Sequence, residues 1–297
     1  MPRPAPEARD QWEAAPCALC GGNRFRRRLD CGDFFYVACR ACGLVQMNPR
    51  PSAAVIRRRY GVEYGGAYLA YEKKNEAAFL RLQERALEDA GFYALEAAVF
   101  SESRARESSP RVLDIGCATG SLLAALKERG WDTIGLEIAR EEAEYARARG
   151  LDVRAKALEE ARFESGAFDA VCASHLIEHL TDPASFTEAL YRVVRPGGRI
   201  YITTPNIDGF QAQLFGGKWR SAIFDHLYLF SRATLSGLFE RHGFTTEKII
   251  TWGGLAEGTA AAPVKRIADR LAKRLNAGDV MILRAVKNEG RGGPGGK

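Results

Sequence analysis

The chain has 297 residues, of which 46% are hydrophobic and 27% charged, a composition that indicates a folded globular protein and excludes disorder over most of its length. The length suits one sizeable domain with a small additional unit, and no signal-peptide pattern or apolar run of the ~18–20 residues that span a bilayer occurs, so we expect a cytoplasmic protein without a membrane span. The net charge of +6 comes from 43 Lys and Arg against 37 Asp and Glu, a small and scattered excess that makes nucleic acid an unfavoured partner.

A cysteine-rich segment, residues 17–51, lies near the N-terminus. It contains two Cys-x-x-Cys pairs, formed by Cys17, Cys20, Cys39 and Cys42. This spacing predicts a zinc-ribbon-like module in which four thiolates close a tetrahedral zinc site. With no open coordination position, the metal would be structural. Disulfides and an iron–sulfur cluster remain the alternatives, and Cys31 is expected to be a spectator.

The remaining chain divides by composition. We expect a disordered tail over residues 1–16, a helical lid or linker over 52–108, a catalytic domain over 109–288 and a second disordered tail over 289–297. The lid is tyrosine-rich, and its aromatic rings are predicted either to line a substrate cleft or to pack the head on the main domain. These residues are Tyr60, Tyr64, Tyr68 and Tyr71.

In the region 109–288, short apolar β-type runs alternate with helical runs that end at glycine, a pattern typical of an α/β fold with a parallel sheet. The predicted strands are Arg111–Ile115, Thr133–Glu137, Asp152–Arg154, Phe168–Ala173, Arg199–Thr204, Thr246–Thr251 and Asp279–Val286. The predicted helices are Gly120–Arg129, Arg140–Arg149, Asp182–Arg195 and Ser231–His242.

The first strand of this region runs into a glycine-rich turn. Gly116 and Gly120 allow the backbone to approach a ligand closely, and the following helix offers free backbone amides at its N-terminus. Glu137, at the end of the next strand, is placed to hold ribose hydroxyls. The alternative is an ordinary tight turn between a strand and a helix.

Four segments in this order, VLDIGCATG, GLEIA, FDAVCASHLIEHLTDP and VVRPGGRIYITTPN, resemble the successive motifs of class I S-adenosylmethionine-dependent methyltransferases. The resemblance implies a Rossmann-like sheet of seven strands in the order 3-2-1-4-5-7-6, with strand seven antiparallel and helices on both faces. It also implies S-adenosylmethionine as cofactor. The run CGLVQMNPRP resembles the zinc-headed methyltransferases of bacterial small-molecule pathways, in which the head covers the mouth of the active site.

The resemblance assigns cofactor-binding roles by position. Asp114 and Gly116 would lie against the methionine part, and Glu137 would accept from the ribose diol. Leu158 would pack on the adenine, because the acidic residue common after the third strand is replaced by Lys156-Ala157-Leu158. The full predicted set is Asp114, Gly116, Cys117, Gly120, Glu137, Leu158, Ser174 and His175. The thiols of Cys117 and Cys172 are interpreted as structural.

Histidines are the candidates for a catalytic base. His226, after the Trp219-containing loop, resembles the W…H-x-y-x-F-S element of this branch and is predicted to be the general base, with His179 as the second candidate. His175 and His179 are four residues apart and would share a helical face if helix followed the fourth strand directly. A metal held by these two is the less favoured interpretation, because the sequence shows no further carboxylate ligand.

The most favoured function is therefore O-methylation of a small molecule such as a quinol, sugar or secondary metabolite. The alternatives are an RNA methyltransferase that uses the zinc module to grip nucleic acid, and a non-catalytic cofactor-binding module. The sequence leaves the acceptor and the oligomeric state open.

Near the C-terminus, cationic and apolar side chains recur together at helical spacing. We interpret this stretch as a solvated helix face rather than a phosphate-binding patch. It comprises Lys265, Arg266, Ile267, Arg270, Leu271, Lys273, Arg274 and Leu275.

Overall fold

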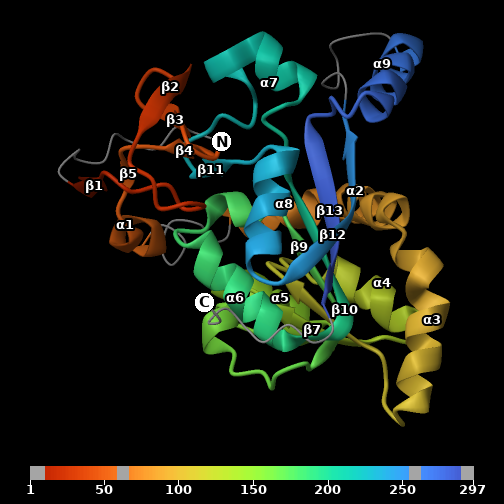
Figure 1. The fold of residues 1–297 in the computed structure, drawn as a ribbon. Helices are drawn as coiled ribbons and strands as arrows, with labels where there is room; N and C mark the ends of the chain where they lie inside the picture. Colours follow the sequence, from red (N-terminus) through yellow and green to blue (C-terminus); the bar gives the residue numbers. More distant parts are fainter. Residues whose placement is uncertain (1–10, 59–66, 254–261, 289–297) are drawn as a thin grey trace.

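The computed structural model describes residues 11–58, 67–253 and 262–288, and its centre is a seven-stranded sheet (Figure 1). The strand order is β12-β13-β10-β9-β6-β7-β8, which confirms the predicted order when the strands are counted along the chain. As predicted, β13 is antiparallel to both of its neighbours. The strands are β6 (Arg111–Ile115), β7 (Asp132–Leu136), β8 (Asp152–Arg154), β9 (Phe168–Ser174), β10 (Val194–Pro205), β12 (Phe244–Trp252) and β13 (Val280–Lys287).

Both faces of the sheet are covered by helices, which is why its strands read as continuous apolar runs. Leu113 and Ile115 of β6 pack on the side of α6 and α8, whereas Val112 packs on the side of α2, α3 and α4. No helix of the described residues is long and apolar enough to cross a membrane. The helices of this domain are α4 (Ser121–Glu128), α5 (Arg140–Ala148), α6 (Pro183–Val193), α7 (Phe210–Phe215), α8 (Arg232–Arg241) and α9 (Ala262–Arg274), with the short 3₁₀ turns η3 (Leu158–Glu160), η4 (Ile177–His179) and η5 (Gly216–Lys218).

The predicted helical stretch before the sheet is divided. It contains α1 (Ala53–Arg58), α2 (Ala67–Ala90) and α3 (Phe92–Ala105). Gly91 separates the last two helices, because its left-handed φ of 84° breaks the helical backbone. Tyr68 and Tyr71 lie on α2, and the predicted Tyr60 and Tyr64 lie outside the described residues.

The N-terminal head is a small antiparallel sheet in the order β11-β4-β3-β2. Its fourth strand, β11 (Tyr228–Leu229), comes from the part of the chain that forms the seven-stranded sheet, and it pairs with Gln46 and Val45. A strand of two residues carries no sequence signal, so the prediction of a separate module over 17–51 missed it. The head's other strands are β1 (Trp12–Glu13), β2 (Phe25–Asp30), β3 (Phe35–Cys39), β4 (Val45–Met47) and β5 (Arg50–Pro51).

The prediction of a disordered tail over residues 1–16 is wrong for residues 11–16. Trp12 and Glu13 form β1, which pairs antiparallel with Pro51 and Arg50 of β5. The Asn48 side-chain amide donates to the carbonyl oxygen of Ala15 at 3.0 Å. These partners are distant in sequence, so local composition does not reveal that residues 11–16 belong to the head.

Candidate active site and cysteine cluster

The loop between β6 and α4 has the tight turn expected of a ligand-binding loop. Gly116 and Gly120 adopt left-handed φ values of 73° and 77°. At Gly120, a Cβ atom would lie 2.5 Å from Leu151 Cδ1, so a larger residue would clash. Ala118, between them, also has a positive φ of 46°, an uncommon conformation for a residue with a side chain.

Glu137 follows β7 and reaches back to this loop. One of its carboxylate oxygens accepts from the Ala118 backbone N–H at 3.0 Å, and the other accepts from the Ala139 N–H at 2.8 Å. Burial raises the pKa of Glu137, although these two hydrogen bonds oppose the effect. Each carboxylate oxygen has two lone pairs, so both retain capacity for a further donor.

Asp114 is the second carboxylate at this edge of the sheet. It is 2% exposed at the end of β6, and its Oδ2 has no hydrogen-bond partner within the described residues. Burial and the nearby negative charge of Glu137 raise the pKa of Asp114 to about 7. A buried and a partly buried carboxylate at the same edge make a site that complements a positively charged ligand.

The other predicted cofactor-binding residues lie in this loop, in η3 and at the end of β9. Cys117 directs its side chain into a buried cluster with Leu123 and Ala143, consistent with a structural thiol. Leu158 is 1% exposed at the start of η3 and belongs to the main core. Ser174 ends β9, and His175 follows it with a left-handed φ of 51°.

Helix α2 crosses over the loop from the other side. The Thr119 hydroxyl donates to Glu76 Oε1 at 3.1 Å, and the Arg149 guanidinium also binds this carboxylate. Glu76 therefore connects α2 to Thr119, before α4, and to Arg149, after α5. Sequence reasoning placed a lid here but did not identify this contact.

A buried glutamate, Glu178, organises the segment after β9. Its two carboxylate oxygens lie 3.1 Å from His175 Nδ1 and 3.0 Å from the Thr204 hydroxyl, which donates to it. Burial alone would raise the pKa of Glu178, but the His175 hydrogen bond and the charges of His175, His179 and His226 lower it to about 2. The sequence prediction missed Glu178, and the available signal was a charged residue within the apolar run after a buried strand.

His179 and His226 lie together beside this glutamate. Their rings pack edge to face with centroids 4.7 Å apart, and donor atoms of Glu178, His179 and His226 all lie within 4.8 Å of one another. His175 is not part of this group, because the segment forms a 3₁₀ turn rather than the α-helix that would place His175 and His179 on one face. The sequence disfavoured a metal here because it showed no carboxylate ligand beside the histidines. The structure shows that Glu178 is such a carboxylate.

Backbone carbonyls orient both rings. His179 Nδ1 lies 2.9 Å from the carbonyl oxygen of Asp225, and His226 Nδ1 lies 2.8 Å from that of Ser221. In the neutral ring this arrangement assigns the proton to Nδ1 and the lone pair to Nε2. Burial, and then the neighbouring His179, lower the pKa of His226 to about 4, so this imidazole is neutral at physiological pH.

His179 lines a pocket. The pocket lies where the end of the head meets the catalytic domain and includes His179, whereas His226 is 8% exposed and packs behind it. Its walls are Pro51, Val55, Ile56, His179, Phe224, Asp225 and Leu227. The imidazole of His179 thus lies against a pocket surface that is otherwise mostly apolar.

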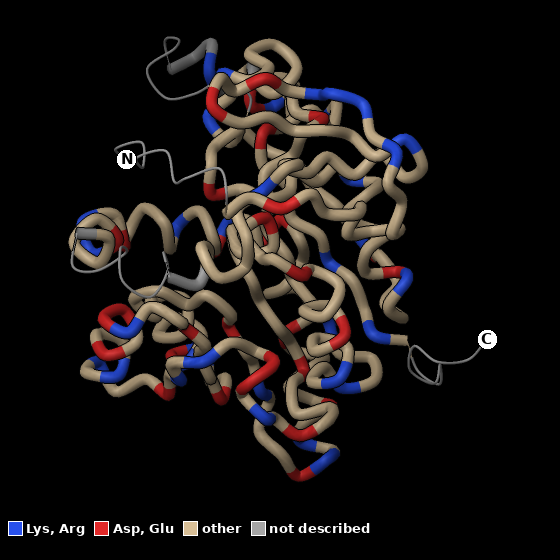
Figure 2. The backbone as a smooth tube through the Cα atoms, turned by 90° about the vertical axis from the view of Figure 1, so that its left-hand side faces the viewer, with Lys and Arg blue, Asp and Glu red and all other residues tan. Residues whose placement is uncertain are grey.

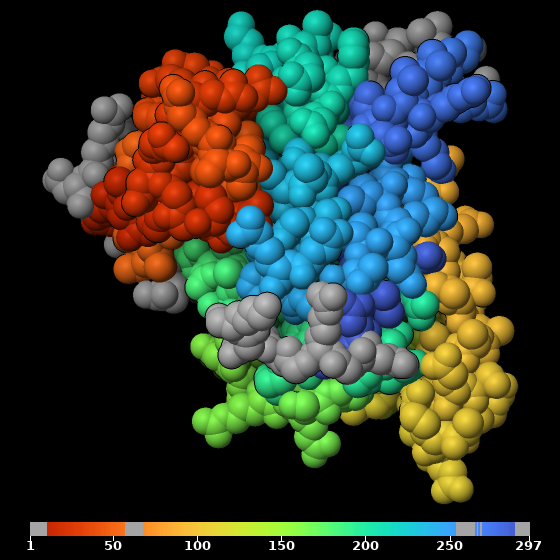
Figure 3. Space-filling view, viewed as in Figure 1, coloured from red at the N-terminus to blue at the C-terminus, as the bar shows by residue number. Residues whose placement is uncertain are grey.

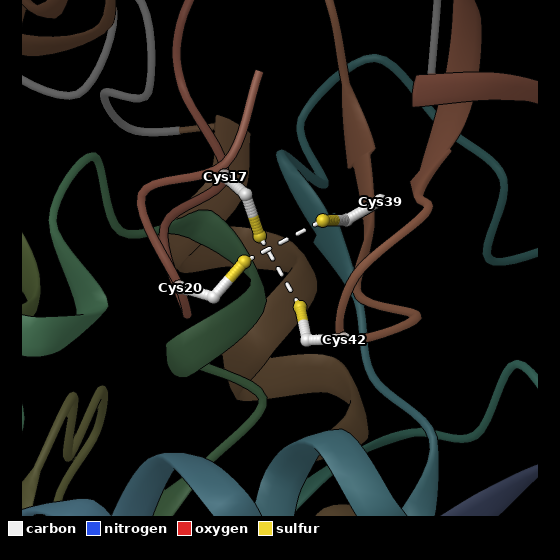
Figure 4. Close-up of side chains that lie close together, drawn as sticks. All are labelled: Cys17, Cys20, Cys39 and Cys42. Atoms are coloured by element: carbon white, nitrogen blue, oxygen red, sulfur yellow. Dashed lines mark hydrogen bonds between the residues drawn. The ribbon is translucent and has the colours of Figure 1, made fainter. Parts of the chain in front are cut away.

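The four predicted cysteines converge in the head (Figure 4). Their Sγ atoms all lie within 4.8 Å of one another, with 3.4 Å between Cys17 and Cys42 and 3.5 Å between Cys20 and Cys39. A tetrahedron with zinc–sulfur bonds of ~2.3 Å has edges of about 3.8 Å, close to this arrangement. Backbone N–H groups of Cys42 and Ala41 lower the pKa of Cys39 to about 7 against the effect of burial, which favours a thiolate. The four residues present thus fit a zinc ion.

Comparison with known proteins identifies the family. A family model described as "Methyltransferase domain" matches residues 83–249, more than half of the chain. The chain belongs to this family. Together with the seven-stranded sheet, this membership defines an S-adenosylmethionine-dependent methyltransferase of class I.

Curated relatives share part of the sequence. The ubiquinone biosynthesis O-methyltransferase of Xylella fastidiosa (strain 9a5c) is 35% identical over 121 residues, which are 38% of this chain and 49% of that protein. The enzyme of the same name from Hahella chejuensis is 35% identical over 114 residues, 36% of this chain and 48% of the relative. The chain thus spans about half the length of the curated relatives it matches.

Among solved structures, a SAM-dependent methyltransferase from Archaeoglobus fulgidus has a TM-score of 0.54 and 22% sequence identity. The match covers 75% of this chain and 100% of that one. At this identity the likeness concerns the fold alone.

The residues at the loop fit the cofactor of this family. S-adenosylmethionine has a sulfonium and an ammonium group, and the buried Asp114 Oδ2, which has no hydrogen-bond partner within the described residues, lies at the same edge as the partly buried Glu137 carboxylate. A cationic ligand would lower the pKa of both carboxyl groups by stabilising their charged forms.

Cofactor binding is therefore expected to release protons. Because Asp114 has a pKa of about 7, it is close to half protonated at neutral pH, and binding should release roughly 0.5 proton from it. Titration calorimetry in buffers of different ionisation enthalpy measures this number. Asp114→Asn should reduce the release, and identical binding enthalpies in all buffers would contradict the prediction.

Proposed function

We propose that the protein transfers the methyl group of S-adenosylmethionine to a hydroxyl group of a small molecule, with a histidine removing the hydroxyl proton. The observation that carries this proposal is the His179–His226 pair beside the buried Glu178, with His179 lining the pocket. Hydroxyl acceptors need a base, whereas more nucleophilic acceptors need mainly positioning. The name of the curated relatives, O-methyltransferase, supports the same choice.

In this proposal His179 faces the acceptor and accepts its proton at Nε2. His226, the base favoured by the sequence, holds the ring of His179 from behind and remains the alternative proton acceptor. The Glu178 carboxylate would stabilise the positive charge that either imidazole gains. When bound, S-adenosylmethionine supplies the electrophilic methyl group.

We propose the cofactor-binding residues from their positions in the fold and from the chemistry of their functional groups. Glu137 would bind the ribose hydroxyls and Asp114 the methionine ammonium group. Gly116, Cys117 and Gly120 would contact the cofactor through their backbone atoms. Further contacts are proposed from Leu158, Ser174 and His175.

We also propose that the four-cysteine cluster holds one structural zinc ion. The site would stabilise the head, which supplies Pro51, Val55 and Ile56 near the pocket through β5 and α1. Lys and Arg positions are interspersed with Asp and Glu positions over most of the chain (Figure 2), a distribution that supports a small-molecule acceptor over nucleic acid.

Methyl-labelled S-adenosylmethionine tests the acceptor class. The full chain is incubated in parallel with phenols, hydroquinones, sugars, aryl amines and total RNA, and mass spectrometry locates the labelled methyl. We expect label on oxygen of a small molecule. Label only on nitrogen, carbon or RNA would overturn the proposal.

Glu137→Ala is expected to weaken S-adenosylmethionine binding by about 1–3 kcal/mol, because the ribose hydroxyls lose charge-assisted hydrogen bonds. Calorimetry measures the affinity, and thermal unfolding checks that the loop, which Glu137 also supports through Ala118, stays folded. Glu160→Ala, an exposed change on η3, is the matched control. Unchanged affinity in Glu137→Ala would remove this residue from the site.

A further inference from the structure

Large apolar side chains are exposed on two helices at one end of the molecule. Of the ten such side chains exposed in the described part of the chain, six lie on α7 or on α9 and the residue after it. Their exposed fractions range from 49% to 71%. They are Phe210, Leu214 and Phe215 on α7, and Ile267, Leu271 and Leu275 on α9 and its C-terminal extension.

The apolar side of α9 faces away from the protein. Ile267, Leu271 and Leu275 are spaced by four residues, so they form one stripe along the helix. The side toward the protein has the small Ala272, which is 7% exposed, and Lys273, which binds Asp89 at 2.7 Å. A helix that packs on a soluble core has the opposite arrangement, with its large apolar residues buried.

The exposed stripe is flanked by positive charge. Arg270 and Arg274 are exposed and follow Ile267 and Leu271 by three residues each, so they lie along one side of the stripe. The acidic residue of the helix, Asp269, binds Lys265 at 2.9 Å. A cationic border along an apolar helix face is typical of helices that lie in a membrane interface.

The two helices and strand β2 form one continuous surface. The Phe210 backbone N–H of α7 donates to the carbonyl oxygen of Ala277, just beyond α9, at 2.9 Å. On the other side of α7, the Arg28 guanidinium of β2 donates to Gln213 at 2.9 Å. Figure 1 and Figure 3 show α7 and α9 at the same end of the molecule. The exposed Arg26 of β2 adds positive charge to this end, whereas its neighbour Arg27 is paired with Asp30 at 2.8 Å.

We propose that this surface docks on an anionic phospholipid bilayer. The apolar stripe of α9 would enter the boundary between headgroups and acyl chains, and Arg270 and Arg274 would bind lipid phosphates. The exposed apolar residues of α7 provide a second point of insertion. A second copy of the chain fits less well, because a symmetric contact through α9 would bring these arginines against one another. The inference is independent of the methyl acceptor.

Vesicle co-sedimentation of the full chain tests this proposal. We expect binding to vesicles containing phosphatidylglycerol and at least about 10-fold weaker binding to phosphatidylcholine alone. The double variant Arg270→Glu with Arg274→Glu should lose about 30-fold or more in partitioning, because each arginine contributes attraction to the anionic surface. Leu271→Ser with Leu275→Ser should lose at least about 10-fold through reduced insertion.

The control is Arg81→Glu with Arg85→Glu, which reverses two exposed charges with the same four-residue spacing on α2. This variant should bind vesicles nearly as well as the unchanged chain. Equal losses in both charge-reversed variants, or no binding of the unchanged chain to anionic vesicles, would overturn the proposal. Light scattering provides a further arm: a dimer that the leucine substitutions dissociate, without vesicle binding, would identify the surface as a contact between copies.

Discussion

Replacing His179 with alanine should lower the turnover of methyl transfer by about 10²–10⁴-fold, the usual effect of removing a positioned base. Cofactor affinity should change little, because Asp114 and Glu137 lie at the ends of other strands. The measurement is kcat for a hydroxyl acceptor, with S-adenosylmethionine affinity determined separately. Turnover of the variant should recover partly as pH rises, since an ionised acceptor needs no base.

His226→Ala separates the two candidate bases. Burial and His179 lower the pKa of His226 to about 4, so His226 stays neutral until the pH approaches that value. Protonation of His226 should therefore not affect the rate of the unchanged enzyme above about pH 4. If His226 acts mainly by holding His179, its removal should cost less turnover than the loss of His179 itself. A larger loss in His226→Ala, with folding intact, would make His226 the base, and full activity of both variants at all pH values would refute a histidine base.

Removing the metal of the head should have the second large effect. We expect about one zinc ion per chain, and Cys39→Ser should abolish stoichiometric zinc and unfold the head, since zinc binding in such sites provides much of the folding free energy. Metal analysis and thermal unfolding measure the two changes. Activity should fall with them, because the head contributes to the pocket, whereas cofactor affinity should be largely retained.

Cys31→Ser is the matched control, because Cys31 lies in the head but outside the four-cysteine cluster. It should retain zinc and the unfolding temperature of the unchanged chain. An iron chromophore in the purified protein, or full zinc content in Cys39→Ser, would contradict the assignment of a four-cysteine zinc site.

The sheet could be predicted from sequence because its determinants are local. Arg111–Ile115 and Asp152–Arg154 were predicted to the residue, and the first of these is bounded by Pro110 and Gly116, which both interrupt a strand. The cysteine cluster was predictable for a similar reason, because the spacing of thiols within each pair is itself the signal.

Long-range contacts could not be predicted in this way. Glu178 is a site residue partly because Thr204 and His226 meet it from distant segments, and neither of these two contacts has a spacing that the sequence reveals. The same holds for β11, whose two residues gain their strand conformation only from pairing with β4. Sequence reasoning thus predicted the residues of the loop after β6, which one short segment builds, more completely than the contacts around Glu178.

Strand β11 completes the sheet of the head although it lies far along the chain from the other strands of that sheet, and this matters when parts are exchanged between related enzymes. The Tyr36 hydroxyl of the head lies 2.8 Å and 2.7 Å from the carbonyl oxygens of Ile223 and His226, and shares its proton between them. The histidine segment is therefore fastened to the head and to the catalytic domain at once. A chimera that received only residues 11–51 from a relative would combine a foreign sheet with a native closing strand, so a functional transplant must carry residues 223–230 as well.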